Sequence, residues 1–232
     1  MLSTELSQES RSSARCAKHI YPRHATAQLF IGVESSMQRE ELQRLIANGF
    51  SRAYHAKLQS FMPVLLGVGG SKPLAALGAR SAVSPLFVES YMPAPIEDML
   101  AQVNLGVERH EIAEIGNLYS RNGSFTQPLL LLAALSLLQL NYSVIVFAAT
   151  SSLRDLMTSI GLPLTYICDA SKHCLHNEGV EWGAYYETKP QVVALRTNEV
   201  SRLVTNSEPV ANMFDCMAPL LSEITKVFEA HL

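Results

Sequence analysis

The sequence predicts an α/β fold in which a mixed central sheet is flanked by helices. Apolar residues recur at steps of three and four through residues 37–58, which is the pattern of an amphipathic helix. Short apolar runs separated by Gly, Pro and Ser follow in residues 63–91, and helix and strand patterns alternate through residues 126–168. Antiparallel strands joined by turns and parallel strands joined by helices can share one sheet.

Length and composition favour one domain. The chain has 232 residues, of which 48% are hydrophobic and 17% charged. This is enough for one sizeable core and short for two. Residues 1–27 are rich in Ser, Arg and His and have little periodicity, so we expect a flexible N-terminal arm there and a single domain over residues 28–232.

The first half of the domain begins with a short strand over residues 29–33. The helix predicted for residues 37–58 places Leu42, Leu45 and Ile46 on one stripe. We expect the next three runs to be strands of an antiparallel meander, and they are residues 63–68, 74–79 and 85–91. A short helix is predicted over residues 95–105.

Residues 110–118 predict a strand with one dry and one polar face. Ile112, Glu114 and Gly116 alternate there with Ala113 and Ile115, as side chains of a strand alternate between faces. The second half then reads, in order, as a helix over 126–140, a strand over 143–149, a helix over 151–160 and a strand over 164–168. This alternation favours parallel pairing in that half. We expect a last edge strand over 191–196 and a final helix over 218–230.

Several classes of protein are disfavoured. The net charge of -3 gives no basic surplus for a nucleic-acid backbone. Residues 129–150 are about as long as a membrane span, but the polar residues in their middle favour two shorter buried elements, so no stable membrane insertion is expected. The four cysteines are scattered and the N-terminus lacks the apolar stretch of a secretory signal, so we expect a cytoplasmic protein.

Six short sequence motifs resemble the thermostable hemolysin family. They occur in the order LGAR at 77–80, LFVESY at 86–91, PIE at 95–97, EIGNL at 114–118, FAATSSLR at 147–154 and WGAYY at 182–186. The similarity covers about residues 40–197. That family is similar to the GNAT acyltransferase superfamily and, within it, to the acyl-homoserine-lactone synthases. The resemblance implies a GNAT-like fold, in which a splayed central sheet holds an acyl thioester in its gap.

The resemblance also implies catalytic residues. Arg80 and Glu114 would be the cleft residues of the synthases, while Asn117 stands where those enzymes have the Arg of a Ser-Arg pair. Glu114 could accept a proton from an attacking amine, or it could form a structural pair with Arg80. Glu89 could share this role, or it could be a solvated strand residue.

A turn before the helix at residue 126 is the candidate site for the donor. Gly123 in such a turn would allow free backbone N–H groups at the helix N-terminus to bind the phosphates of acyl-CoA or of an acyl-phosphopantetheine arm. A plain left-handed turn with helix capping is the alternative. The candidate donor-binding residues are Asn117, Leu118, Tyr119, Arg121, Asn122, Gly123 and Ser124. The sequence has no complete Arg-x-x-Gly-x-Gly loop and no counterpart of the acidic pair that holds S-adenosylmethionine in the synthases, so lactone formation is not expected.

Phe147, Trp182 and Tyr185 are the candidates for the wall of an acyl pocket, because a long chain gains roughly 0.8 kcal/mol per buried methylene. Packing of the aromatic cluster against the sheet is the alternative. Residues 168–176 contain two Cys and two His, which are zinc ligands in other proteins. Their spacing matches no known zinc pattern, so no metal is predicted.

The sequence therefore favours an acyltransferase that moves an acyl group from an acyl-CoA or an acyl carrier protein to a small amine acceptor, with Glu114 as general base acting directly or through water. A carrier protein is a candidate partner. One alternative is a membrane-perturbing hemolysin, as the family's name implies, although no cationic amphipathic segment is visible. The other is a non-catalytic module that binds an acyl thioester.

Overall fold

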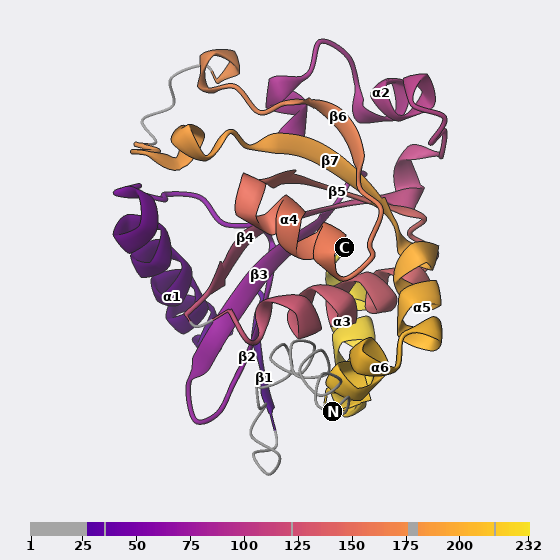
Figure 1. The fold of residues 1–232 in the computed structure, drawn as a ribbon. Helices are drawn as coiled ribbons and strands as arrows, with labels where there is room; N and C mark the ends of the chain where they lie inside the picture. The colour runs from indigo at the N-terminus through magenta and orange to yellow at the C-terminus, as the bar shows by residue number, and fades with distance from the viewer. Residues whose placement is uncertain (1–26, 35, 122, 176–180, 216) are drawn as a thin grey trace, which may run out of the picture.

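The computed structural model describes residues 27–34, 36–121, 123–175, 181–215 and 217–232 (Figure 1). The arm expected over residues 1–27 lies outside the described residues except for Ala27. Its separation from a single domain therefore stays a prediction.

The described residues form one open sheet of seven strands in the order β1-β2-β3-β4-β5-β7-β6. The strands are β1 Gln28–Gly32, β2 Val64–Gly69, β3 Pro73–Ser81, β4 Ile112–Ser120, β5 Val144–Ala149, β6 Thr165–Asp169 and β7 Gln191–Arg196. Only β4 and β5 run parallel among these neighbours, and the other pairs are antiparallel. The prediction of a mixed sheet is confirmed.

Helices flank this sheet on both faces (Figure 1). They are α1 Met37–Tyr54, α2 Ile96–Gln102, α3 Thr126–Gln139, α4 Ser151–Ser159, α5 Thr197–Asn206, α6 Glu208–Asp215 and α7 Leu221–His231. Short 3-10 helices lie at η1 Val88–Tyr91, η2 Arg109–Glu111, η3 Lys172–Cys174, η4 Tyr185–Thr188 and η5 Ala218–Leu220.

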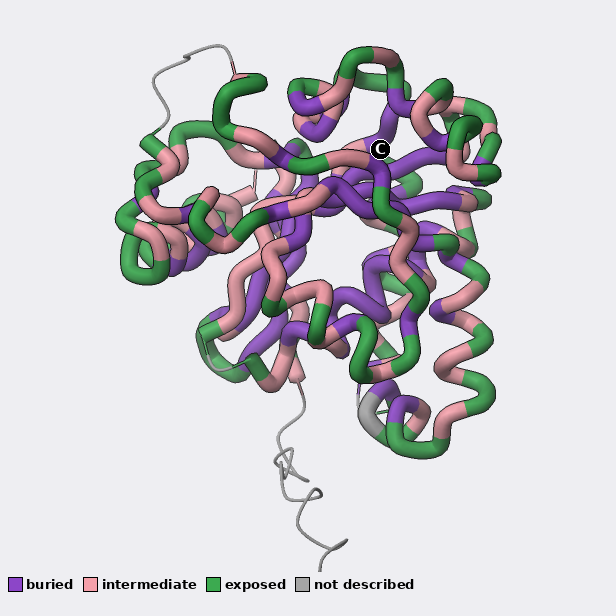
Figure 2. Tube along the Cα trace, turned by 45° about the horizontal axis from the view of Figure 1, so that its top comes forward, coloured by how far each residue is buried: buried purple, intermediate pink, exposed green. Residues whose placement is uncertain are grey.

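Alternation along β2 explains which helix covers which face. Leu65 packs in one cluster with Leu42 and Ile46 of α1, whereas Leu66 belongs to the cluster that contains α3 and α7. Successive side chains of a strand point to opposite faces, so α1 and the α3–α7 pair lie on opposite sides. Figure 2 shows the inner strands and α3 as the buried centre of the molecule.

Helix α3 is apolar on all sides because it is enclosed. It lies between the sheet and the helices α5, α6 and α7, and most of its residues are buried. An element that is apolar all round is typical of an interior position. Within the described part of the chain, no helix combines the length and the apolarity that a membrane crossing requires.

The strand predicted over residues 85–91 is wrong. This segment is a turn followed by the 3-10 helix η1, and β4 takes its place beside β3. Its backbone N–H groups at Leu86, Phe87 and Val88 bind the carboxylates of Glu89 and Glu114 instead of a neighbouring strand. An apolar run alone does not reveal such side-chain partners.

Two expectations for the second half of the chain are also corrected. β7 is an interior strand between β5 and β6, and β6 is the edge. Parallel pairing holds only for β4 with β5, because β7 runs antiparallel to both of its neighbours. Helices α5 and α6 were not predicted.

Candidate active site

β4 and β5 separate in the middle of the sheet. Their parallel pairing ends where Glu114 lies beside Val146. Beyond this point β4 continues along β3 to Ser120, while β5 continues along β7 to Ala149. The two strands thus diverge, and the expected splayed sheet is confirmed.

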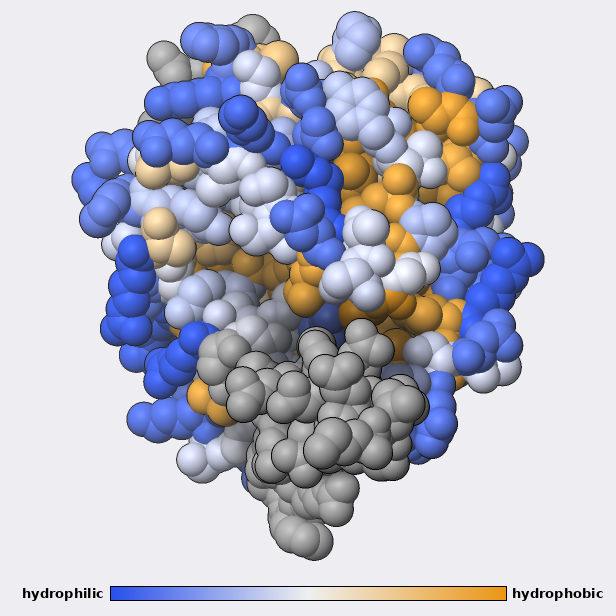
Figure 3. All heavy atoms as spheres, viewed as in Figure 1, coloured by the Kyte–Doolittle hydropathy of each residue, from blue (hydrophilic) through white to orange (hydrophobic). Residues whose placement is uncertain are grey.

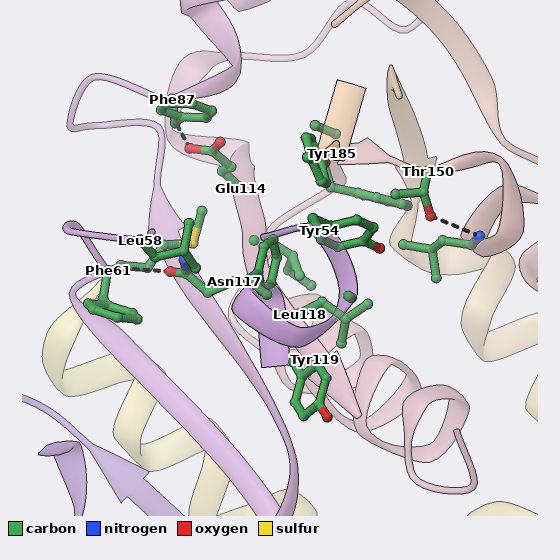
Figure 4. Close-up of a pocket in the computed structure, with 18 of the residues that line it drawn as sticks. Tyr54, Leu58, Phe61, Phe87, Glu114, Asn117, Leu118, Tyr119, Thr150 and Tyr185 are labelled. Atoms are coloured by element: carbon green, nitrogen blue, oxygen red, sulfur yellow. Dashed lines mark hydrogen bonds between the residues drawn. The ribbon is translucent and has the colours of Figure 1, made fainter. Parts of the chain in front are cut away.

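A cavity of about 460 Å³ lies where the strands diverge (Figure 4). Its walls come from both strands, from the end of α1 and the segment after it, from α3 and α4, and from the segment that contains Trp182 and Tyr185. On the face drawn in Figure 3, apolar surface lies in a hollow between α1 at the left and α4 near the centre. The cavity therefore suits a largely apolar ligand that spans the split.

The cavity has two chemically different parts. Leu130, Phe147, Leu153 and Leu156 from α3, β5 and α4 form an aliphatic part with one ring. An aromatic part is formed near the end of α1. Its members are Phe50, Tyr54, Phe87, Tyr91, Trp182 and Tyr185.

β4 carries a bulge beside the cavity. Asn117 and Leu118 together face Leu77, since the pairs on either side are Gly116 with Gly78 and Tyr119 with Ala76. Asn117 has a positive φ of 50°, which this irregularity requires. A bulge leaves an extra residue of β4 unpaired in the ladder with β3.

The side chain of Asn117 is occupied within the fold. Its Oδ1 accepts a hydrogen bond of 2.9 Å from the backbone N–H of Met62. A Cβ at Gly78 would lie 3.0 Å from this oxygen and 2.7 Å from the Cβ of Met62, so glycine makes room for the contact. This bond leaves the Nδ2 donors and the backbone of Asn117 for a ligand, and Leu118 and Tyr119 also line the cavity.

Glu114 lies at the closed end of the cavity and is 1% exposed, so the polar face expected for β4 is buried. Its Oε2 accepts a 2.8 Å hydrogen bond from the Phe87 N–H, and its Oε1 accepts one of 3.0 Å from the Val88 N–H. Burial raises the pKa of this carboxyl to about 7, against these two hydrogen bonds and the attraction of Arg80. Near neutral pH both protonation states are populated, which is what a residue that accepts and returns a proton needs.

Arg80 faces the same cavity from β3. It is the register partner of Glu114, but the ion pairs of the described residues do not include it. Its Nη1 donates a 2.8 Å hydrogen bond to the carbonyl oxygen of Pro85. The structural pair between Arg80 and Glu114 is thus replaced by a longer-range attraction.

Glu89 is not among the residues that line the cavity, and it is not a solvated strand residue. Its carboxylate forms an ion pair with Arg109 at 2.8 Å and also accepts hydrogen bonds from the N–H groups of Leu86 and Ile96. Although burial opposes it, the bond from Arg109 and the two backbone bonds lower the pKa of Glu89. Arg109 also binds Glu97 of α2, so Glu89 ties η1, η2 and α2 together.

The glycine in the turn before α3 is left-handed, as the plain-turn alternative requires, and phosphate binding at this turn stays a prediction. Gly123 has φ 74°, and its carbonyl oxygen accepts a hydrogen bond of 3.1 Å from Thr126. Thr126 lines the cavity, so α3 begins at its edge, whereas Arg121, Gly123 and Ser124 are not lining residues. Asn122 lies outside the described residues.

Trp182 and Tyr185 pack on other aromatic rings and line the cavity, and their role in an acyl pocket stays a prediction. Their ring centroids lie 5.4 Å apart, and each packs on a ring from elsewhere, Trp182 on Phe87 at 5.8 Å and Tyr185 on Tyr54 at 5.3 Å. Both also line the cavity. The segment is docked on the end of α1 by a hydrogen bond of 2.7 Å from the Ala184 N–H to the carbonyl oxygen of Tyr54.

Sequence reasoning missed several lining residues, including Phe50, Tyr54, Met62 and Ser120. The first three precede the family motifs, which begin at residue 77, and no local pattern identifies them as cavity-lining residues. Ser120 ends β4, and its Oγ is buried without a hydrogen-bond partner among the described residues. A buried hydroxyl without a partner is costly and is available to a ligand.

The cysteine- and histidine-containing segment shows no metal cluster within its described residues. No group of three or more His, Cys, Asp or Glu side chains comes close enough to hold an ion in the described ranges, and His176 lies outside them. Burial raises the pKa of Cys168 to about 11, so its thiol stays protonated at neutral pH.

The family model of thermostable hemolysins matches residues 33–201, which is more than half of the chain. The chain belongs to the thermostable hemolysin family. No curated protein sequence matches this family member.

Solved structures share the fold of this thermostable hemolysin family member at low sequence identity. A CoA-dependent acyl-homoserine-lactone synthase, BjaI, solved with SAM and isopentyl-CoA, has a TM-score of 0.55 at 13% identity, over 78% of this chain and 89% of its own. The acyl-homoserine-lactone synthase LasI has a TM-score of 0.52 at 14% identity, over 75% and 92%. FeeM, an N-acyl amino acid synthase from uncultured soil microbes, has a TM-score of 0.51 at 14% identity, over 76% and 96%. The fold is thus that of GNAT-like acyltransferases.

Proposed function

We propose that this chain is an acyltransferase, which moves an acyl group from a thioester to a small amine acceptor with Glu114 as general base. The observation that carries the proposal is the position of Glu114. It lies where β4 and β5 part, at the head of a cavity that is otherwise largely apolar, and its pKa is raised to about 7 by burial.

The donor would lie along the open edge of β4. Ser120 is six positions beyond Glu114, an extended distance of roughly 20 Å, which suits a phosphopantetheine arm. The bulge at Asn117 would offer backbone N–H groups to the thioester carbonyl, and Ser120 Oγ would bind a polar group of the arm. The phosphates would reach the N-terminus of α3. BjaI, whose fold is similar, holds isopentyl-CoA, so acyl-CoA is the first donor to test, with an acyl carrier protein as the second.

The reaction would use these groups in order. The amine nitrogen attacks the thioester carbonyl, and Glu114 takes the proton that nitrogen loses, directly or through water. The new C–N bond forms as the C–S bond breaks, and the proton passes from Glu114 to the departing thiolate. The acyl chain would occupy the aliphatic part of the cavity beside Leu153 and Leu156.

Release of free thiol tests this proposal. The pure protein is incubated with acyl-CoA thioesters of increasing chain length and a panel of amines, and thiol is followed by a chromogenic reagent. We expect thiol release that requires both substrates, and a decrease in kcat/KM of roughly 10²- to 10⁴-fold in Glu114→Gln. Glu187→Gln is the matched control, because Glu187 is exposed beside Tyr186 and does not line the cavity.

The other outcomes separate base, chemistry and binding. Full turnover in Glu114→Gln would mean that Glu114 is not the base. Thermal stabilisation by a thioester without any transfer would indicate a non-catalytic binding module. If no thioester raises the melting temperature or reacts, the cavity is not a donor site.

A further inference from the structure

Two opposite charges line the same end of the cavity without neutralising each other. Arg80 and Glu114 occupy paired positions on β3 and β4, so their side chains project from the same face of the sheet. No ion pair of 4.0 Å or less joins them in the described part of the chain. Each is held by backbone instead, Glu114 by the Phe87 and Val88 N–H groups and Arg80 by the Pro85 carbonyl.

The Arg80 guanidinium has donors left for a ligand. It carries five N–H donors, and one hydrogen bond, to Pro85, is seen for it among the described residues. In a cavity with largely apolar walls, a planar guanidinium favours a planar anion such as a carboxylate, which it can bind through two parallel hydrogen bonds.

This anion does not belong to the thioester donor as placed above. The donor's phosphates would lie near Ser120 and the start of α3, roughly 20 Å along β4 from the level of Glu114 and Arg80. The thioester and its acyl chain carry no charge. The remaining molecule in the reaction is the acceptor.

We infer that the acceptor is an α-amino acid, whose carboxylate binds Arg80 while its amino group faces Glu114. This inference rests on the proposed function. An α-amino acid holds its ammonium and carboxylate within one short unit, which matches two side chains that leave directly paired positions of neighbouring strands. The amino group would thus arrive beside the residue that removes its proton.

The neighbouring walls indicate an apolar side chain on this amino acid. Phe87, whose N–H binds Glu114, packs its ring on Trp182 at 5.8 Å and on Tyr91 at 5.7 Å. All three rings line the cavity. Phenylalanine and leucine are therefore the acceptors to test first.

The experiment compares each amino acid with the amine that lacks only its carboxylate. Phenylalanine is paired with phenethylamine, and leucine with isopentylamine, in the thiol-release assay. A site built for a carboxylate leaves a buried charge unpaired when that group is missing, so we expect kcat/KM to favour the amino acid by roughly thirtyfold or more. In Arg80→Met this ratio should approach one, and Arg80→Lys should retain part of it. Arg202→Met is the matched control, since Arg202 lies on the surface of α5 and does not line the cavity.

The outcomes separate this inference from the proposed function. If the wild type acylates phenethylamine and isopentylamine as well as it acylates the amino acids, the acceptor inference is overturned and acyl transfer stands. If nothing is acylated, acyl transfer fails, and thermal shift decides on the binding site. Stabilisation by phenylalanine but not by phenethylamine supports the carboxylate site, provided that the effect is lost in Arg80→Met. Arg80→Lys can lose the effect or keep it without changing this conclusion. Equal stabilisation by both compounds, or none by either, overturns it.

Discussion

Glu114→Gln should change how stability depends on pH, by an amount that follows from the raised pKa. Burial raises the pKa of Glu114 from an ordinary 4.5 to about 7 in the folded chain, so the folded state binds this proton more tightly than the unfolded state does. The stability that the bound proton contributes is full below pH 4.5 and is lost as pH rises through 7. One pKa unit corresponds to about 1.4 kcal/mol, so this group alone should lower the stability of the wild type by roughly 2 to 3 kcal/mol between pH 5 and pH 8.

A glutamine side chain does not titrate, so Glu114→Gln lacks this pH dependence of stability. It also loses one of the two acceptors for the Phe87 and Val88 N–H groups, a cost that does not change with pH. Urea unfolding at pH 5 and pH 8 gives the free energy of unfolding of the wild type and of Glu114→Gln. The difference between the two proteins should change between these pH values, whereas the difference between the wild type and the control Glu187→Gln should not. A difference that is the same at both pH values would refute the account of Glu114 as a buried carboxyl with a raised pKa. In parallel, kcat/KM of the wild type should rise with pH around 7, as the base ionises.

Three further predictions concern the cavity and its frame. Leu156→Trp fills the aliphatic part of the cavity, so it should shorten the longest acyl chain that is accepted. Each excluded methylene should cost roughly 0.8 kcal/mol of binding free energy. A series of thioesters of increasing chain length measures this, and an unchanged profile would contradict the prediction. Gly183→Ala should destabilise the fold by about 1 to 3 kcal/mol in urea unfolding, because Gly183 has φ 51° and a Cβ there would lie 1.9 Å from the Tyr54 carbonyl oxygen; unchanged stability would show that the docking on α1 tolerates a side chain. Arg109→Met should lower the free energy of unfolding by about 1 to 2 kcal/mol at pH 7. This loss should shrink below pH 4, because the Glu89 carboxylate then becomes protonated in the folded state as well as in the unfolded state. Equal losses at pH 7 and pH 3 would argue against an electrostatic role.

The confirmed predictions depend on the hydrophobic pattern and on the motifs shared with the family. The helix predicted over 37–58 from its apolar stripe is found at Met37–Tyr54, and the helix predicted over 126–140 is found at Thr126–Gln139. Family resemblance indicated that Arg80 and Glu114 face one cleft, and the structure places both in the lining of the cavity. The assignment of a base and of a donor site among these residues stays a prediction.

Contacts between distant segments account for what was missed. The run from Leu86 to Tyr91 is apolar enough for a strand, but the carboxylates of Glu89 and Glu114 bind the N–H groups of its first three residues. The apolar run of β7 would suit an edge strand or an interior strand equally well. Its pairing with both β5 and β6 decides that it is interior.

By itself the sequence determined most of the helices and strands and the family to which the chain belongs, because these depend on neighbours within a few residues or on the order of short motifs. Tertiary structure alone decided that β4 and β5 stop pairing at Glu114, that Asn117 sits in a bulge held by Met62, and that Tyr54 meets Tyr185 in the cavity wall. Strand order, bulges and ring contacts join residues far apart in the chain, and their free energies depend on burial that no local pattern records.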